Sequence, residues 1–195
     1  MEPIYIILEG PDRCGKDTQQ NLIVKNISHR VFHKLHYSAL PFQDKEKHIM
    51  YSTKLYDEMF KNMSALSTYN INAIFNRSYL SESVYAPLYR NYNGDYVFDI
   101  EKKHRNLLDK IYLITMINQP ETLNNRDDGN SQSNNIEDIT AEIDGFVRSH
   151  HKSLIKNKLL LDTKNMKADE VSNIISQFLS EKRPNYIDQQ LSLTF

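Results

Sequence analysis

The order of apolar and helical segments along these 195 residues predicts an α/β fold, a parallel sheet of five strands with helices on both faces. Two observations lead to this class. Five short apolar runs, each typical of a buried strand, alternate with stretches of helical periodicity. The first run ends in a loop framed by two glycines, and a helical stretch follows that loop directly. In such sheets, ligands bind where the parallel strands end.

The predicted strands are short apolar runs bounded by polar or turn residues. They cover residues 3–8, 31–37, 71–75, 110–116 and 158–162. Pro41 lies shortly after the second run and forbids its simple continuation. The third run ends at Asn76 and Arg77, which places two polar side chains at the carboxyl end of a strand.

The predicted helices have apolar residues at three- and four-residue spacings. The first begins near Lys16, with Leu22, Ile23 and Ile27 as its inward face, and the last has its apolar stripe at residues 171–178. The others cover residues 45–63, as one helix with a break near 52–53 as the open alternative, then 78–90, 99–108, 120–126 and 139–155. Pro87 must kink or end the helix predicted over residues 78–90. No linker or repeat divides the chain, so we expect one domain over residues 1–195.

The composition is that of a soluble globular protein, with 39% hydrophobic and 25% charged residues. The net charge of −1 gives no support to a nucleic-acid partner. Cys14 is the single cysteine, which excludes an internal disulfide and fits a reducing compartment. No signal peptide is apparent, and no apolar run approaches the roughly 20 residues that span a bilayer. We therefore expect a cytoplasmic protein without a membrane partner.

Residues 10–18 have the sequence GPDRCGKDT and form a P-loop motif between the first strand and the first helix. Gly10 and Gly15 allow the backbone N–H groups to converge on a phosphate, and the helix adds its partial positive N-terminus. Lys16 supplies a mobile charge for the outer phosphates. The residues expected around the phosphates of ATP are Gly10, Arg13, Cys14, Gly15, Lys16, Asp17 and Thr18.

Phosphoryl transfer needs positive groups around the transferred phosphoryl group. Arg13, Lys16 and Arg77 are the candidate catalytic residues, and Arg126 lies at the edge of a candidate lid. An arginine directly after an apolar strand either pairs with a carboxylate or binds an anion. The nearby P-loop favours anion binding by Arg77.

Residues 127–135 have the polar sequence DDGNSQSNN, which is typical of a mobile loop. Two interpretations are open, a disordered insertion or a lid that closes on substrate. Its place between two predicted helices beside the site favours a lid at about residues 126–140. His150 and His151 do not share a helix face, so a solvated face is expected there and not a metal site.

Two sequence blocks resemble the thymidylate kinase family. Residues 8–16 read LEGPDRCGK, like the opening of members whose P-loop carries Asp-Arg. Residues 76–85 read NRSYLSESVY, which is similar to the family's Asp-Arg-Tyr-x-x-Ser-x-x-Ala-Tyr block. Continued to residue 90, this block looks most like compact thymidylate-kinase-like proteins of phages. The resemblance implies a P-loop kinase fold with a short lid.

The resemblance also implies roles for individual residues. Asp12 would hold the sugar 3′-hydroxyl, and Arg13 would be the catalytic arginine supplied by the P-loop. Arg77 would bind the acceptor phosphate, Tyr85 would lie against the sugar and disfavour a 2′-hydroxyl, and Phe42 would contact the base. The implied acceptor-binding residues are Asp12, Phe42, Arg77, Ser81 and Tyr85. Family members with a P-loop arginine have a lid poor in basic residues, and no Lys or Arg lies between residues 126 and 148 here.

The acceptor side departs from the family pattern. The family's Phe-Pro-x-Arg, whose arginine binds the acceptor phosphate, appears as Leu-Pro-Phe-Gln at residues 40–43. Lys45 is the nearest basic residue. The family's base-reading Arg-Trp/Phe-Glu has no clear equivalent in residues 51–60. The base is therefore open between thymine, another base and a modified pyrimidine.

The expected Mg²⁺ site also departs from the family. Asp17 replaces the usual Ser/Thr ligand, and Asn76 replaces the aspartate before the strand-three arginine. Carboxylates are good ligands for Mg²⁺. Either the carboxylate has moved from the strand end into the P-loop, so that Asp17 binds the metal and Thr18 contacts phosphate, or Thr18 and waters hold the metal while Asp17 points away.

These observations predict a deoxynucleoside monophosphate kinase that transfers the γ-phosphoryl of ATP to dTMP or a related deoxynucleotide. A deoxynucleoside kinase is the first alternative, although the glutamate that those enzymes place after strand two is absent from residues 36–43. A nucleotide-binding regulator without catalysis is the second, because of Asp17 and Asn76. By analogy we expect a homodimer, in the host cytoplasm if the chain is phage-encoded.

Overall fold

The computed structural model describes residues 2–27, 31–38, 40, 42–126, 129 and 131–182. Its centre is one sheet of five parallel strands in the order β2-β3-β1-β4-β5. The strands are β1 Tyr5–Glu9, β2 Phe32–Leu35, β3 Asn72–Asn76, β4 Ile111–Ile117 and β5 Asn157–Asp162. The predicted fold class is confirmed, and β2 is shorter than the predicted run.

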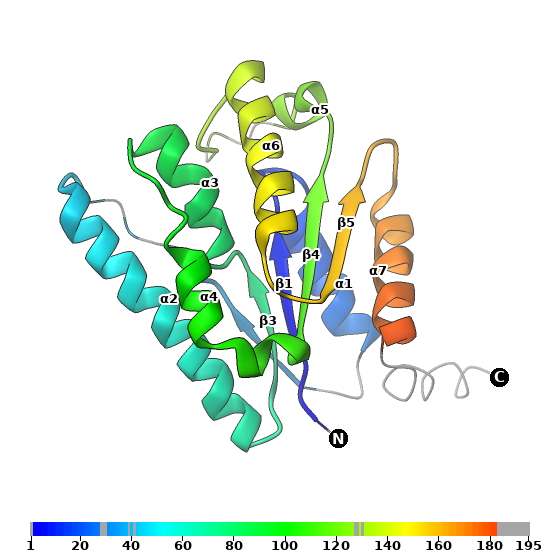
Figure 1. Ribbon diagram of the computed structural model, residues 1–195. Coiled ribbons are helices and arrows are strands. Elements are labelled where there is room, and N and C mark those ends of the chain that lie inside the picture. Colours follow the sequence, from blue (N-terminus) through cyan, green and yellow to red (C-terminus); the bar gives the residue numbers. More distant parts are fainter. Residues whose placement is uncertain are drawn as a thin grey trace.

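Helices cover both faces of this sheet (Figure 1). They are α1 Lys16–Asn26, α2 Lys45–Thr68, α3 Leu80–Tyr89, α4 Val97–Lys103, α5 Pro120–Asn124, α6 Ile136–Lys152 and α7 Ala168–Lys182, with a 3₁₀ helix, η1, at Arg105–Lys110. Helices α2, α3, α4 and α6 lie on the near face in Figure 1, and α1 and α7 lie behind.

The core has two layers because successive side chains of a strand point to opposite faces. On the α1 and α7 side, Ile6 packs in one buried cluster with Ile23. On the α2 and α4 side, Ile7 packs in a second cluster with Phe60. Each such buried side chain stabilises the fold by about 1.5–3 kcal/mol relative to an exposed one. The central strand β1 is therefore buried on both faces, as its continuous apolar sequence predicts.

The topology fixes where ligands bind. After β1 the chain builds β2 and then β3 on one side, and afterwards crosses to β4 and β5 on the other. The strand order thus changes direction beside β1, and the loops after β1, β3 and β4 meet at this switch point.

Helix α2 runs unbroken over Lys45–Thr68, so the prediction of one helix is confirmed and the alternative break near residues 52–53 is wrong. Ser52 is fully buried on the inward face of the helix. The helix starts at Asp44, whose side chain accepts hydrogen bonds from the Glu46 and Lys47 backbone amides. A strong N-cap and an inward serine keep the helix continuous.

The helix predicted over residues 99–108 is two elements, α4 and η1, which meet at His104. The His104 ring stacks on Phe60 with centroids 4.9 Å apart, and its Nε2 lies 2.9 Å from the Asp57 carboxylate. These tertiary contacts hold the chain at a corner and override the local helical pattern.

The solvated face predicted at His150 is also wrong. His150 is buried, and its Nδ1 lies 2.9 Å from the Thr115 hydroxyl of β4, whereas His151 is exposed. The tail after Pro184 lies outside the described residues. Within the described part of the chain, no helix has the length and apolar character needed to cross a membrane.

Candidate functional site

The P-loop, residues 10–18, joins β1 to α1 at the switch point. Gly10 has φ 136°, and a Cβ there would lie 2.1 Å from the Met116 carbonyl oxygen of β4. Gly15 has φ 94°, and the space beside its Cα is open. Gly10 thus permits close packing of the loop on the sheet, and Gly15 permits the turn into α1 while leaving room for a phosphate.

Lys16 is buried inside the loop. Its Nζ donates hydrogen bonds to the carbonyl oxygens of Gly10, at 2.8 Å, and Pro11, at 2.6 Å. Burial lowers the pKa of Lys16 because an ammonium loses its hydration there. Carbonyl oxygens compensate this charge only in part, so an incoming phosphate oxygen is the stronger partner.

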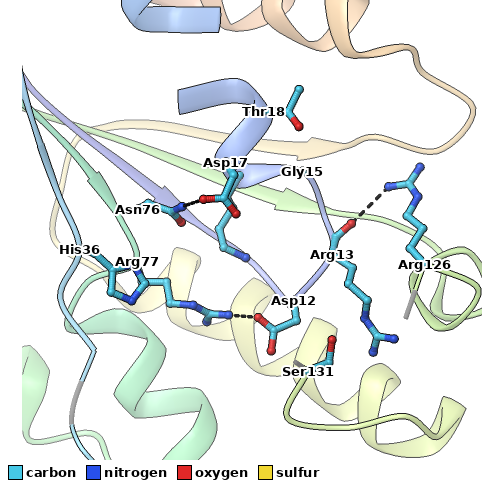
Figure 2. A pocket seen from close by; sticks show the side chains of 11 residues that line it. Asp12, Arg13, Gly15, Asp17, Thr18, His36, Asn76, Arg77, Arg126 and Ser131 are labelled. Atoms are coloured by element: carbon cyan, nitrogen blue, oxygen red, sulfur yellow. Dashed lines mark hydrogen bonds and ion pairs between the residues drawn. The ribbon is translucent and has the colours of Figure 1, made fainter. Parts of the chain in front are cut away.

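A polar cavity of about 380 Å³ opens beside the P-loop (Figure 2). Its volume is within the roughly 300–1,000 Å³ of small-molecule sites. It is lined by Asp12, Arg13, Gly15, Lys16, Asp17, Thr18, His36, Asn76, Arg77, Arg126 and Ser131. All four predicted cationic residues therefore lie around one cavity.

Arg77 leaves the end of β3 in the left-handed region, with φ 73°, while its N–H donates to the Leu8 carbonyl. Its guanidinium forms an ion pair with Asp12 and donates from Nη1 to the Tyr85 hydroxyl at 3.1 Å. Burial acts to lower the pKa of Arg77, but Tyr85 and Asp12 outweigh it and raise the pKa. The structure brings these three predicted acceptor-binding residues into contact.

The segment predicted as a lid contacts the P-loop. Arg13 donates from Nη2 to the Ser133 carbonyl at 2.6 Å, and Arg126 donates from Nη1 to the Arg13 carbonyl at 3.3 Å. The Gln132 amide donates to Asp12 Oδ2 at 3.2 Å. Among the described residues, hydrogen bonds that involve Arg126, Gln132 and Ser133 thus join this segment to the loop that carries Asp12 and Arg13.

Asp17 and Asn76, the two departures from the family's metal site, are in direct contact. The Asn76 Nδ2 donates to Asp17 Oδ1 at 2.6 Å (Figure 2). The Asn76 Oδ1 is buried and has no hydrogen-bond partner among the described residues. Thr18 lines the same cavity. A carboxylate, an amide oxygen and a hydroxyl are the hard oxygen donors that suit Mg²⁺.

Ser81 is engaged by a buried carboxylate, Glu9 at the end of β1. The Ser81 hydroxyl donates to Glu9 Oε2 at 2.7 Å, and the Ser78 amide donates to Oε1 at 2.8 Å. Burial raises the pKa of the Glu9 carboxyl, and these donors oppose that shift. Glu9 therefore fixes the first turn of α3 against β1, and acceptor binding by Ser81 stays a prediction.

Phe42 lies at a second cavity, of about 300 Å³, together with His48, Arg90 and Tyr92. Its ring centroid lies 5.2 Å from that of Tyr51. Contact of Phe42 with a base stays a prediction.

Sequence reasoning missed three residues around the site. His36 and Ser131 line the main cavity. Glu142 of α6 accepts a hydrogen bond from the Tyr89 hydroxyl at 2.5 Å, and burial raises the pKa of Glu142 to about 7. His36 could have been found because it lies near the carboxyl end of a predicted strand, whereas the Tyr89–Glu142 contact has no local signal.

No protein-family model matches this chain, and no curated protein matches it. Among solved structures, thymidylate kinase from Candida albicans is 12% identical with a TM-score of 0.70, and the match covers 95% of this chain and 94% of that one. The YorR protein from Bacillus subtilis, solved in complex with phosphorylated GDP, is 21% identical with a TM-score of 0.65, and the match covers 91% and 95%. The expected P-loop kinase fold is confirmed, with a thymidylate kinase among the structural neighbours.

Proposed function

We propose that the chain is an ATP-dependent deoxynucleoside monophosphate kinase, which transfers the γ-phosphoryl group to the 5′-phosphate of dTMP or a related deoxynucleotide. One observation carries the proposal: Arg13, Lys16, Arg77 and Arg126 line one cavity at the P-loop together with Asp12. Two anionic substrates that react with each other need this concentration of positive charge.

The residues divide the work by position. Lys16 and the P-loop amides hold the outer phosphates of ATP, and Arg77 holds the acceptor phosphate on the opposite side. Arg13 lines the same cavity and stabilises the charge on the transferred phosphoryl group. Because the acceptor oxygen is already anionic, positioning and charge neutralisation supply the rate, and no strong general base is required.

Asp12 and Tyr85 select the sugar. The Asp12 carboxylate would accept a hydrogen bond from the 3′-hydroxyl, and the buried Tyr85 ring would lie against the sugar and disfavour a 2′-hydroxyl. The contact of both residues with Arg77 supports this proposal, because phosphate and sugar are adjacent in a nucleotide.

The oxygens at Asp17, Asn76 and Thr18 suit Mg²⁺, so the residues present fit the ion. Asp17 and Thr18 would hold it, and the unpartnered Asn76 Oδ1 would accept a hydrogen bond from its hydration shell. Bound there, Mg²⁺ would neutralise phosphate charge. The Asn76 amide keeps the Asp17 carboxylate directed at the cavity.

The names of the structural neighbours support a nucleotide substrate. One is a thymidylate kinase, and the other was solved with phosphorylated GDP. We extend the proposal to a cytoplasmic homodimer by analogy with kinases of this type.

The test is a direct assay of purified protein with ATP and Mg²⁺. Each deoxynucleoside monophosphate and its ribose counterpart are offered in turn, and ADP release is followed. We expect turnover with at least one deoxynucleotide and weaker turnover with its ribose counterpart. Binding of ATP without turnover of any monophosphate would contradict the proposal and favour the regulator.

A further inference from the structure

The backbone turns sharply at Arg77, directly after β3. Its φ is 73°, in the left-handed region that residues other than glycine adopt rarely. Among the described residues that share this feature, Asn70, Asn91 and Asn165 are of a type that tolerates it, and the other two are Arg13 and Arg77. Both arginines line the cavity. A left-handed arginine persists only where surrounding contacts hold it, and such residues cluster at functional sites.

Two hydrogen bonds to the end of β1 hold this turn. The Arg77 amide donates to the Leu8 carbonyl at 3.0 Å, and the next amide, that of Ser78, donates to Glu9 Oε1 at 2.8 Å. These amides belong to the two planar peptide groups that flank the Arg77 Cα, so their bonds fix its φ and ψ. The first bond continues the pairing of β1 with β3, whereas the second goes to a side chain. Glu9 therefore supplies an acceptor at the point where the strand pairing ends.

Glu9 can hold a neighbour in place because its own side chain is fixed. It is buried, with 1% of its surface exposed. Its Oε2 accepts a hydrogen bond from the Ser81 hydroxyl at 2.7 Å, and its Oε1 accepts a second one, from the Ser78 hydroxyl, at 2.6 Å. All of these donors lie in the segment that directly follows Arg77.

The turn decides where the Arg77 guanidinium lies. Side chains alternate along a strand, so a continued strand would direct Arg77 to the face of Phe75, which packs in the cluster on the α2 side. With the left-handed turn, the guanidinium lies at the cavity and pairs with Asp12 of the P-loop (Figure 2). The position of this positive charge therefore depends on the backbone conformation of Arg77.

We propose that Glu9 is a positioning residue for the acceptor: by holding the backbone of Arg77, it directs the guanidinium to the 5′-phosphate of the nucleotide. The inference rests on the proposed function for the role of Arg77 and adds the group that places it. Glu9 acts through an acceptor oxygen at the correct reach from β1, and its negative charge is not required. A neutral side chain of the same length would serve, and a shorter charged one would not.

The test separates reach from charge with two variants. Glu9→Gln keeps an acceptor oxygen at the same reach, so kcat/KM for the monophosphate that the wild type turns over fastest should stay within about threefold of wild type. Glu9→Asp keeps the charge and withdraws the oxygen by one methylene. The same value should then fall by about tenfold, because a misplacement of about 1 Å can cost up to about 10²-fold. KM for ATP should change less than about threefold in both variants. Combining Glu9→Asp with Arg77→Gln should cause no loss beyond that of Arg77→Gln alone.

Glu101 of α4 provides a matched control. It is also buried, and its carboxylate accepts hydrogen bonds from the Leu154 amide, at 3.0 Å, and from the hydroxyls of Tyr79 and Ser153. Glu101 is not among the residues that line the cavity. Glu101→Asp loses the same methylene, so it should lower the free energy of unfolding and leave kcat/KM unchanged.

Hydrogen exchange gives a measurement that does not depend on turnover. In Glu9→Asp the Ser78 amide proton should exchange at least about tenfold faster than in the wild type, because its acceptor has been withdrawn. The Leu154 amide proton, whose acceptor is Glu101, should exchange at the wild-type rate and so excludes a general loss of stability.

The outcomes separate this inference from the proposed function. Equal kcat/KM values in Glu9→Gln and Glu9→Asp would overturn the inference, because reach would then not matter. An equal loss in Glu101→Asp, or a loss in the double variant that adds to that of Arg77→Gln, would also overturn it. If the wild type turns over no monophosphate, the proposed function fails, and the Ser78 exchange rate decides whether Glu9 holds the turn. An unchanged Ser78 rate in Glu9→Asp would overturn the inference whatever the activity.

Discussion

The two halves of the site are built differently. The half proposed to bind ATP comes from one continuous stretch, β1, the P-loop and the start of α1, and among the described residues Lys16 donates hydrogen bonds to atoms of that loop. The half proposed to bind the acceptor is assembled from the chain after β2, the end of β3, α3 and, in the described part of the predicted lid, Gln132 and Ser133. Its central contacts, Asp12 with Arg77 and Arg13 with Ser133, join residues 65 and 120 positions apart.

This difference indicates that the P-loop half determines the reaction and that the acceptor half determines which substrate is used. A local motif can keep its geometry while the surrounding chain changes, so substitutions elsewhere should leave the proposed binding and reaction of ATP intact. An acceptor site made of distant segments can change its substrate through single exchanges in any one of those segments. Variants in the ATP half should therefore affect every acceptor, and variants in the acceptor half only some.

The largest effect is expected at Lys16. Lys16→Met removes the buried ammonium that stabilises charge on the transferred group, which should lower kcat by about 10²–10³-fold with every acceptor. The measurement is ADP release under saturating ATP. Lys25→Met, at the exposed end of α1, is the control and should retain full activity. A loss of activity with only one acceptor type would contradict the division of the site into an ATP half and an acceptor half.

Arg77→Gln tests the acceptor half. It removes an ion pair with Asp12 and a charged contact to the acceptor phosphate, so kcat/KM for a monophosphate should fall by about 10²-fold. KM for ATP should change less than about threefold, since Arg77 is not a P-loop residue. Steady-state kinetics with each substrate varied in turn give both values. Arg105→Gln, an exposed arginine of η1, serves as the control.

Glu142 should make the α3–α6 contact sensitive to pH. Burial, opposed by the Tyr89 hydrogen bond and aided by nearby Asp12, raises its folded-state pKa from 4.5 to about 7. Because the pKa is higher in the folded state than in the unfolded state, the protonated Glu142 stabilises the fold. This stabilisation is fully present below pH 4.5 and is lost as the pH rises through about 7.

Glu142→Gln keeps the shape and removes this titration, so it should be more stable than the wild type at pH 8, by on the order of 2–3 kcal/mol, and equal to it near pH 4. Urea unfolding at both pH values measures the difference. Glu137→Gln, exposed on the same helix, should show no such pH-dependent gain. A constant difference at both pH values would contradict the buried titration.

The smallest effect is expected where the halves meet, at Asp17 and Asn76. If the metal's carboxylate has moved into the P-loop, Asp17→Ser should raise the Mg²⁺ concentration required for ATP binding by about tenfold, roughly 1.4 kcal/mol. Asp17→Ser combined with Asn76→Asp should restore it by returning a carboxylate to the end of β3. Calorimetric titration of ATP at graded Mg²⁺ measures both. Effects that simply add in the double variant would reject the exchange and favour Thr18 with waters.

Sequence reasoning was most successful where structure is local. The alternating strands and helices predicted the fold, and the P-loop motif predicted the cavity at the end of β1. The carboxyl ends of parallel strands meet at one edge, so proximity of Asp17 and Asn76 could also be inferred. Each of these conclusions needs only strand order and nearest neighbours.

Contacts between distant segments could not be predicted. The corner at His104 depends on Phe60 and Asp57, which lie on another helix. The burial of His150 depends on Thr115, 35 residues away in β4. Nothing in the local pattern of either histidine reveals these partners, because burial is a property of the packed structure and not of helical spacing.

The two bonds of Asp12 bear on how the protein discriminates among sugars. One carboxylate oxygen holds Arg77 and the other accepts from the Gln132 amide. A sugar hydroxyl that reaches Asp12 exchanges one partner for another, so it gains only the difference between two hydrogen bonds. A misplaced sugar hydroxyl that displaces one of these partners without bonding to Asp12 costs a hydrogen bond and gains none. In the proposed function, Asp12 would therefore reject mismatched sugars strongly while adding little to the affinity for the correct one.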